Sequence, residues 1–279
     1  WVAKGNVVTY QPSLRGVQGV QGIYVPSHRP IFAYQNIANI PTQPHTSAHA
    51  YAVYSGEIQA RYNGGGGNVL HHIKAALLSM AVWGYATDPM VPDLVAKKTF
   101  EEFEKVLREI LPPKLGFIKL AIANPEVILQ TRTGNFAIDA VSGGVASLVD
   151  LAWQIFMFSN DHKGKFVVTI DEPENHLHPE LQQTLFPALL RTFSNAQFIV
   201  ATHNPIIIAS VANSNVYALR FESDDKVYSV ALDTVDKSGT SNEILREVLG
   251  LPYSMPVLVS EKLREIAARY LEGELNQDT

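Results

Sequence analysis

The chain has 279 residues, 46% of them hydrophobic and 18% charged, so it can bury the core of one large domain or of a domain with an insertion. Its 22 basic and 27 acidic residues give a net charge of -5, which excludes a strongly basic nucleic-acid footprint. The absence of cysteine excludes disulfides and thiolate metal sites and fits a cytoplasmic location. The apolar runs are far shorter than the roughly 20 residues of a membrane span, so we expect no membrane association.

Patterns in the first part of the chain predict two strands, a loop and three helices. The strands are expected at 6–10 and 20–27, the loop at 30–49, and the helices at 47–62, 69–86 and 99–112. A glycine run at 63–68 separates the first two helices. Thr99 is the expected N-cap of the third helix, because Glu102 follows at the spacing of a capping box.

The second half of the chain predicts an α/β arrangement. Residues 115–141 are expected to form two β segments with a Thr-Gly-Asn turn, and a long apolar helix follows at 142–158. Strands are then expected at 165–170, 197–201 and 216–221, helices at 179–193 and 205–212, a hairpin near 223–226, and terminal helices at 241–249 and 256–271. The alternation predicts a largely parallel sheet with helices on its faces. Pro187 is expected to kink or shorten its helix.

Polar residues follow two of the expected parallel strands, at the sheet edge where open α/β sheets bind ligands. The strand "FVVTIDE" ends in Asp171 and Glu172. One carboxylate can hold the water shell of Mg²⁺, while the second takes a proton from an attacking water. The next strand, "IVATHNP", ends in His203, which can reach the phosphate that this water attacks. The pattern therefore predicts a phosphate-hydrolysing site.

Ser142, Gly143 and Gly144 begin the long apolar helix. The free amide groups and positive dipole of a helix N-terminus suit an anion, and glycine lets the backbone approach a phosphate closely. In this order, "SGG", "FVVTIDE", "ENHLHP" and the strand-end histidine resemble the signature motif, Walker B strand, D-loop and switch histidine of ABC-type ATPases. The wording "DEPENHLHP" is similar to that of the soluble OLD and SMC-like class, which is also grouped with the AAA family.

This resemblance implies a P-loop NTPase fold of the ABC-ATPase type, with a mostly parallel sheet and flanking helices. It implies one domain spanning 1–279, with a helical lid inserted at 30–114. ATP and Mg²⁺ are the implied ligands. The implied assembly is a homodimer formed head to tail through the signature motif and the D-loop, with an effector nuclease or DNA as a further partner that the residues themselves do not show.

The resemblance also implies a role for each site residue. Asp171 would orient Mg²⁺ through water, Glu172 would position or deprotonate the attacking water, and His203 would contact the γ-phosphate. The segment 142–144 would cover the ATP bound to the partner subunit. Gln35 is the expected lid-hinge glutamine that completes the metal shell.

The phosphate-loop pattern G-x-x-x-x-G-K-[ST] does not occur in the sequence. In ABC-type ATPases this loop precedes the motifs found here, so we expect the parent protein to carry it upstream of Trp1. ATPase activity is expected on the condition that the parent protein supplies the loop.

Three functions remain open. The first is an ATPase that powers a DNA-repair-like or anti-phage assembly. The second is a non-hydrolysing scaffold or regulator, against which the presence of Asp171, Glu172 and His203 argues. The third, the ATP-binding subunit of a membrane transporter, is disfavoured by the D-loop wording. His176 and His178 form an H-x-H pattern, for which turn packing and contact with a partner subunit are expected rather than metal binding.

Overall fold

The structure is a computed structural model. It describes residues 19–27, 34–41, 43–62, 69–123, 125–221, 226–232 and 257–271. The strand expected at 6–10, the glycine run at 63–68 and the helix expected at 241–249 lie outside the described residues. The chain divides into two compact units, and the division falls between Ser210 and Val211.

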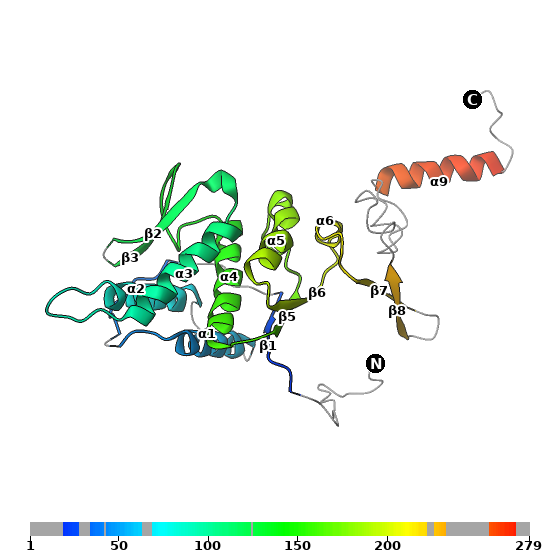
Figure 1. Cartoon of the computed structure of the whole chain (residues 1–279). Helices are drawn as coiled ribbons and strands as arrows, with labels where there is room; N and C mark the ends of the chain where they lie inside the picture. The colour runs from blue at the N-terminus through cyan, green and yellow to red at the C-terminus, as the bar shows by residue number, and fades with distance from the viewer. Residues whose placement is uncertain are drawn as a thin grey trace. The chain divides into compact units, whose positions relative to one another are not determined.

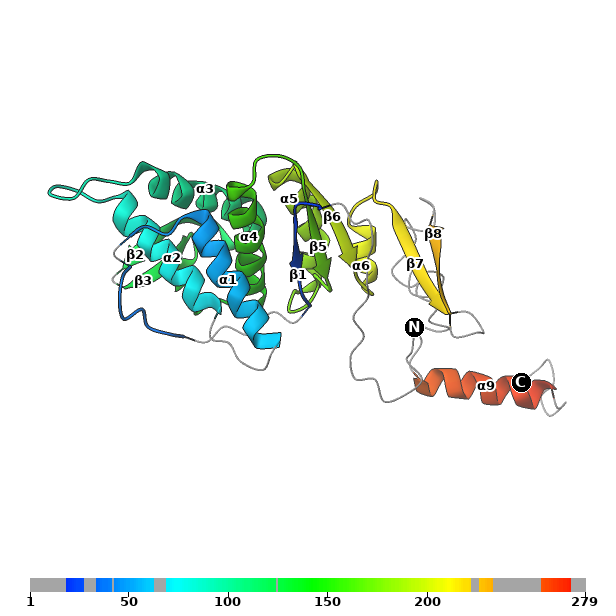
Figure 2. The ribbon, with the colours of Figure 1, turned by 90° about the horizontal axis from the view of Figure 1, so that it is seen from below.

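A parallel sheet carries the residues of interest in the first unit. It consists of β1 (Gly22–Val25), β5 (Phe166–Asp171) and β6 (Ala196–Ala201), in the order β1-β5-β6. Both pairs are parallel, and Ile23, Val168 and Phe198 lie side by side across them. Figures 1 and 2 show α4 and α5 on one side of this sheet. A parallel sheet with flanking helices confirms the expected α/β class.

Helices form most of the rest of the first unit. They are α1 (Ser47–Tyr62), α2 (Val69–Gly84), α3 (Leu94–Ile110), α4 (Gly143–Asp161), α5 (Pro179–Thr192), α6 (Pro205–Ala209) and the short 3₁₀ helix η1 (Pro113–Leu115). All residues of α4 from Val145 to Phe158 are buried, as expected of a helix that is apolar on every side. Trp153 of α4 packs edge-on against Phe103 of α3, with 5.1 Å between ring centroids. No described helix is both long and apolar enough to pass through a bilayer.

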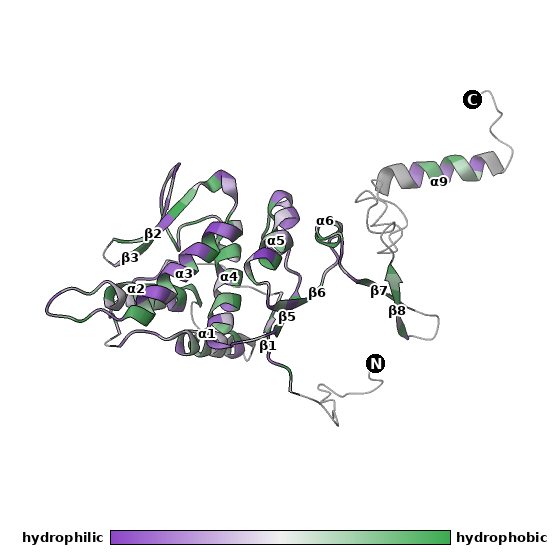
Figure 3. Ribbon diagram, in the orientation of Figure 1, coloured by the Kyte–Doolittle hydropathy of each residue, from purple (hydrophilic) through white to green (hydrophobic). Residues whose placement is uncertain are grey.

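The beginning of α3 differs from the prediction. The helix starts at Leu94, and its N-cap is Asp93, whose carboxylate accepts hydrogen bonds from the amides of Val95 and Ala96 at 2.8 Å. Thr99 is buried one turn inside the helix, so the predicted capping box was wrong. The apolar stripe of α3 extends N-terminal to that pattern, and Figure 3 shows hydrophilic and hydrophobic residues along the helix.

The segment predicted as two β segments is a three-stranded antiparallel sheet. It consists of β2 (Phe117–Ala123), β3 (Glu126–Thr131) and β4 (Gly134–Ala137), in the order β2-β3-β4. The predicted turn joins β3 to β4, where the Thr131 hydroxyl donates to the Gly134 carbonyl at 2.7 Å.

The second unit contains a hairpin and a helix among its described residues. Strands β7 (Val216–Phe221) and β8 (Val227–Leu232) pair antiparallel, and α9 covers Val257–Leu271. The hairpin and the last helix were predicted. The prediction that β7 continues the parallel sheet was wrong, because β7 pairs with β8 alone among the described strands. Pro187 does not end α5, which continues to Thr192.

Candidate functional site

Strands β5 and β6 end together and place Asp171 and Glu172 at the edge of the parallel sheet. Asp171 lies opposite Ala201 in the last pair of the register, and the amide of Glu172 donates to the carbonyl of Ala201 at 2.8 Å. Glu172 then leaves the strand with φ of 45°, a left-handed conformation that costs a non-glycine residue about 1–3 kcal/mol. Strain of this kind is concentrated at functional sites.

The side chain of Glu172 is held between two neighbours. His203, which follows β6, places Nδ1 at 3.3 Å from Glu172 Oε1. On the other oxygen, Asn175 Nδ2 donates to Glu172 Oε2 at 3.0 Å and also lies 3.1 Å from the carbonyl of Ser27, just beyond β1. The His203 side chain is 74% exposed and that of Glu172 37%. The carboxylate is therefore oriented from both sides while the imidazole stays open to a ligand.

A second carboxylate, that of Glu174, lies behind the histidine. The side chain of Glu174 is only 6% exposed, and its Oε1 is 3.7 Å from His203 Nδ1. The hydroxyl of Thr202 donates to the same oxygen at 2.7 Å, whereas Oε2 is buried without a hydrogen bond to any described residue. The imidazole of His203 thus faces two carboxylates.

The sequence-based interpretation placed Glu174 and Asn175 only within the D-loop and assigned no role to Thr202. A signal for Asn175 is present in retrospect. It lies three residues after Glu172 in a tight turn, where its amide donates to the Glu172 carbonyl at 3.2 Å, and asparagine favours turns. The contact of Thr202 with Glu174 spans 28 positions and has no local signal.

The turn after Glu172 leads into α5. His178 is the N-cap of α5, and its Nδ1 accepts from the amide of Glu180 at 3.4 Å. His176 is exposed and has a left-handed φ of 67°. The two histidines of the H-x-H pattern therefore serve the geometry of the turn. Across the described ranges, no group of three or more histidine or carboxylate side chains is placed to hold a metal ion.

Ser142, Gly143 and Gly144 form the N-terminus of α4. Ser142 is the N-cap, and its hydroxyl accepts from the amide of Val145 at 3.5 Å. A Cβ atom added to Gly143 would meet nothing within 4 Å, whereas one added to Gly144 would lie 3.2 Å from Leu181 Cδ1. One glycine thus faces open space while the next permits close packing on α5.

The N-terminus of α4 adjoins the turn that carries the acidic residues. A Cβ on Gly144 would lie 3.4 Å from the carbonyl oxygen of His176, and the hydroxyl of Ser147 donates to the carbonyl of Asn175 at 3.4 Å. The structure therefore brings the predicted anion-binding helix end and the predicted D-loop together.

Gln35 lies in a different cluster. Its side chain is exposed, and its backbone carbonyl accepts from Lys74 Nζ at 3.3 Å. Lys74 is fully buried and forms ion pairs with Glu126 and, at 2.9 Å, with Asp139. No hydrogen bond among the described residues joins Gln35 to Glu172 or His203. Its place in a metal shell stays a prediction.

The carboxylates at the end of β5 fit a magnesium site of the kind expected. Mg²⁺ keeps most of its water ligands in nucleotide sites and takes one or two carboxylates together with phosphate oxygens. Asp171 is half-buried at the last position of β5, with Glu172 directly after it. This donor set suits a hydrated cation that arrives with its phosphates.

Comparisons with known proteins agree with the motifs. Residues 107–209 match the family model described as "AAA domain, putative AbiEii toxin, Type IV TA system". The retron Ec83 probable ATPase of Escherichia coli is 32% identical over 136 residues, which are 45% of this chain and 24% of that protein. The Septu protein PtuA of Bacillus thuringiensis is 26% identical over 169 residues, which are 56% of this chain and 43% of that protein.

A solved structure, the SMC head domain from Thermotoga maritima, shares 17% identity and a TM-score of 0.38, over 48% of this chain and 46% of that chain. That likeness is too distant to bear on function. The family model and the curated relatives confirm the resemblance to AAA-family ATPases. The chain spans less than half the length of these two relatives.

Proposed function

We propose that this chain supplies the hydrolytic half of an ATPase site and acts as a head-to-tail dimer. The observation that supports this most directly is the 3.3 Å approach of His203 Nδ1 to Glu172 Oε1 at the carboxyl ends of two parallel strands. Open α/β sheets bind their ligands at that edge. The left-handed backbone of Glu172 adds to the case, because such strain persists where function requires it.

Each acidic residue has a separate task in this proposal. Glu172 positions the attacking water and takes its proton, and the contacts from Asn175 and His203 keep its carboxylate in one orientation. Asp171 holds the water shell of Mg²⁺, which supplies positive charge to the phosphates when bound. His203, exposed on the ligand side, donates to an oxygen of the γ-phosphate.

The N-terminus of α4 binds the γ-phosphate held by a partner subunit. Its first amides point away from the helix and carry partial positive charge, which favours an anion. The open space at Gly143 leaves room for a phosphate against the backbone. This helix end contacts the turn at His176 and Asn175. A nucleotide bound at the helix end is therefore coupled to the turn that follows Glu172.

One face of the parallel sheet has large exposed side chains. Tyr24 is 59% exposed and Ile199 54% exposed, and they lie in register with Thr169 on the same face. Parallel sheets are almost always covered on both faces, and among the described residues those of β1 and β6 on this face are exposed. We propose that the segment carrying the phosphate loop packs here and holds the other phosphates of the same ATP.

The assembly proposed is a defence or repair machine that works with an effector protein or DNA. Two relatives carry the names retron Ec83 probable ATPase and Septu protein PtuA, and the segment 107–209 that matches the AAA-domain family model includes the acidic strand end and the histidine. The proposal for the whole protein rests on these names, whereas the proposal for the site rests on its geometry.

Hydrolysis of ATP by the full-length protein tests the proposed function. Glu172→Gln keeps the size of the side chain and one acceptor oxygen but removes the base. We expect turnover to fall by about 10²–10⁴, while ATP binding and ATP-dependent dimerisation in sedimentation persist. Glu109→Gln, the same change at an exposed position of α3, is the matched control. Unchanged turnover in Glu172→Gln would remove this residue from the proposed role.

A further inference from the structure

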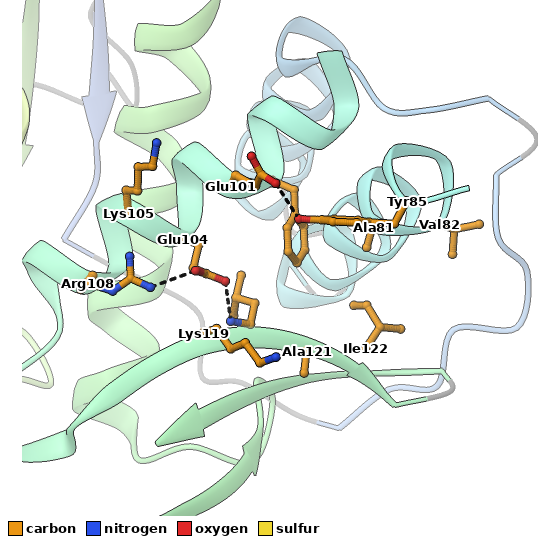
Figure 4. A pocket seen from close by; sticks show the side chains of 12 residues that line it. Ala81, Val82, Tyr85, Glu101, Glu104, Lys105, Arg108, Lys119, Ala121 and Ile122 are labelled. Atoms are coloured by element: carbon orange, nitrogen blue, oxygen red, sulfur yellow. Dashed lines mark hydrogen bonds and ion pairs between the residues drawn. The ribbon is translucent and has the colours of Figure 1, made fainter. Parts of the chain in front are cut away.

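A groove of about 700 Å³ opens between α2, α3 and strand β2 (Figure 4). Its size lies within the range of about 300–1,000 Å³ typical of ligand pockets. Its walls include the apolar side chains of Ala81, Phe100, Leu120 and Ile122. No residue of the proposed ATP site lines it.

The unpaired edge of strand β2 forms one wall of the groove. It pairs only with β3 among the described strands. The amide of Leu120 donates to Glu104 Oε2 at 3.0 Å, and the carbonyl of Ile118 accepts from Arg108 Nη2 at 2.7 Å. These residues therefore turn their backbone groups away from β3 and towards α3, whose side chains take the place of a neighbouring strand.

The outward edge of β2 is also open at Ile122, two residues after Leu120. In an antiparallel strand, alternate residues turn both backbone groups to the same side, so Ile122 faces outward like Leu120. Its register partner Val127 uses its own carbonyl to accept from the amide of Ile138, on the far side of β3. Within the described chain, the amide and carbonyl of Ile122 have no hydrogen-bond partner.

The charged residues that line the groove give a small excess of positive charge, with Lys105, Arg108 and Lys119 against Glu101 and Glu104. Glu104 pairs with Arg108 at 2.9 Å, and Glu101 accepts from the hydroxyl of Tyr85 at 3.0 Å (Figure 4). Lys105 and Lys119 line the groove and form no ion pair with a described residue. An occupant with carboxylates is therefore favoured over a basic one.

We propose that this groove binds an extended, acidic segment of a partner protein, which adds to the open end of β2, beyond the stretch that α3 covers. The backbone of the segment pairs with Ile122, an apolar side chain enters between Phe100 and Leu120, and carboxylates approach Lys105 and Lys119. Strand addition of this kind obtains affinity from main-chain hydrogen bonds and specificity from alternate side-chain pockets. A second copy of this chain is a poorer occupant, because α3 lies along the open edge and admits only a slim segment.

Short blocked peptides test the proposal on the full-length protein. A peptide of alternating valine and glutamate is the probe, with a valine-lysine peptide and an N-methylated valine-glutamate peptide as comparisons. We expect the glutamate peptide to bind at least about tenfold more tightly than either comparison, and to slow hydrogen exchange at Ile122. Failure of the glutamate peptide to bind, or equal binding of the N-methylated peptide, would overturn strand addition.

Three variants of the protein locate the peptide-binding site. Ile122→Pro removes the outward amide without breaking the β2–β3 ladder, since proline is tolerated on sheet edges. Ile122→Val keeps the amide and is the matched control. We expect peptide binding to be lost in the first and retained in the second. Lys119→Glu, which leaves the backbone intact, should weaken the glutamate peptide about tenfold. Self-association that Ile122→Pro abolishes would instead identify a second copy as the occupant.

Discussion

His203 Nδ1 lies 3.3 Å from Glu172 Oε1, while Asn175 Nδ2 holds the other oxygen of the same carboxylate at 3.0 Å. The histidine follows β6 and the glutamate follows β5, so their distance depends on the parallel register of the two strands. Glu174 approaches the same ring nitrogen at 3.7 Å. At this end of the sheet, the exposed imidazole of His203 therefore faces the carboxylates of both Glu172 and Glu174.

Removal of the imidazole should slow hydrolysis more than it weakens nucleotide binding. His203→Ala eliminates the donor proposed for the γ-phosphate and one of the two contacts that orient Glu172. Loss of one such donor in other enzymes reduces turnover by about 10²–10³, and we expect a loss of that order. Steady-state turnover and ATP affinity measured together distinguish the effects. A variant with normal turnover and poor affinity would assign His203 to binding alone.

The glycines at the start of α4 should respond differently to the same substitution. In helices, replacing glycine by alanine stabilises by roughly 0.5–1 kcal/mol in the absence of a clash. Gly143→Ala meets open space, whereas Gly144→Ala places a methyl group 3.2 Å from Leu181 Cδ1. We expect thermal unfolding to show Gly143→Ala at or above the wild-type midpoint and Gly144→Ala below Gly143→Ala.

A bulkier change at Gly143 separates the fold from the proposed dimer. Gly143→Asp adds a carboxylate at the helix end, where it complements the dipole but repels phosphate. The free energy of unfolding should stay close to that of the wild type, while ATP-dependent dimerisation is lost in sedimentation. Dimerisation that survives this change would contradict the assignment of the signature segment.

The sequence predicted the strand-end residues because the information is local. Apolar runs that lead to Asp171 and to His203 specify two parallel strands, and parallel neighbours end at one edge of a sheet. The contacts of Asn175 and Glu174 could not be read in this way. They depend on a left-handed turn at Glu172, and non-glycine residues rarely adopt that conformation.

The errors have physical causes of their own. Thr99 and Glu102 match a capping box, yet Asp93 lies ahead of the full apolar stripe and provides two hydrogen bonds to the first turn. Strand β7 follows α6 in a β-α-β order, which favours a parallel neighbour, but β7 pairs with β8, the next strand along the chain, as an antiparallel hairpin. The buried ion pair of Lys74 has no local sequence signal, because its partner Asp139 is 65 positions away.

Substitution of Asp93 tests whether this residue is the N-cap of α3. Asp93→Ala leaves the amides of Val95 and Ala96 without an acceptor, so we expect a loss of about 0.5–2 kcal/mol in the free energy of unfolding. Asp93→Asn can still accept and should lose less. Denaturant titration of both variants provides the measurement. An unchanged midpoint for Asp93→Ala would show that α3 does not depend on this cap.

The buried Lys74 should make stability depend on pH in the alkaline range. Burial opposes the charge on Lys74, but hydrogen bonds and ion pairs with Glu126 and Asp139 outweigh it and raise the pKa of the amine above its ordinary value of 10.5. A raised pKa in the folded state contributes stability that is fully present below about pH 10.5. That contribution is lost as the pH rises through the folded-state pKa.

Lys74→Met tests this directly, because methionine fills similar space without the charge. The change leaves Glu126 and Asp139 without their buried partner, so we expect a loss of about 3–5 kcal/mol near neutral pH. Adding Asp139→Asn should recover part of it. The difference between the wild type and Lys74→Met should narrow above about pH 10.5, as measured by urea unfolding. Lys119→Met, at an exposed lysine, is the control, and a loss equal to that of Lys74→Met would exclude the ion pairs as the cause.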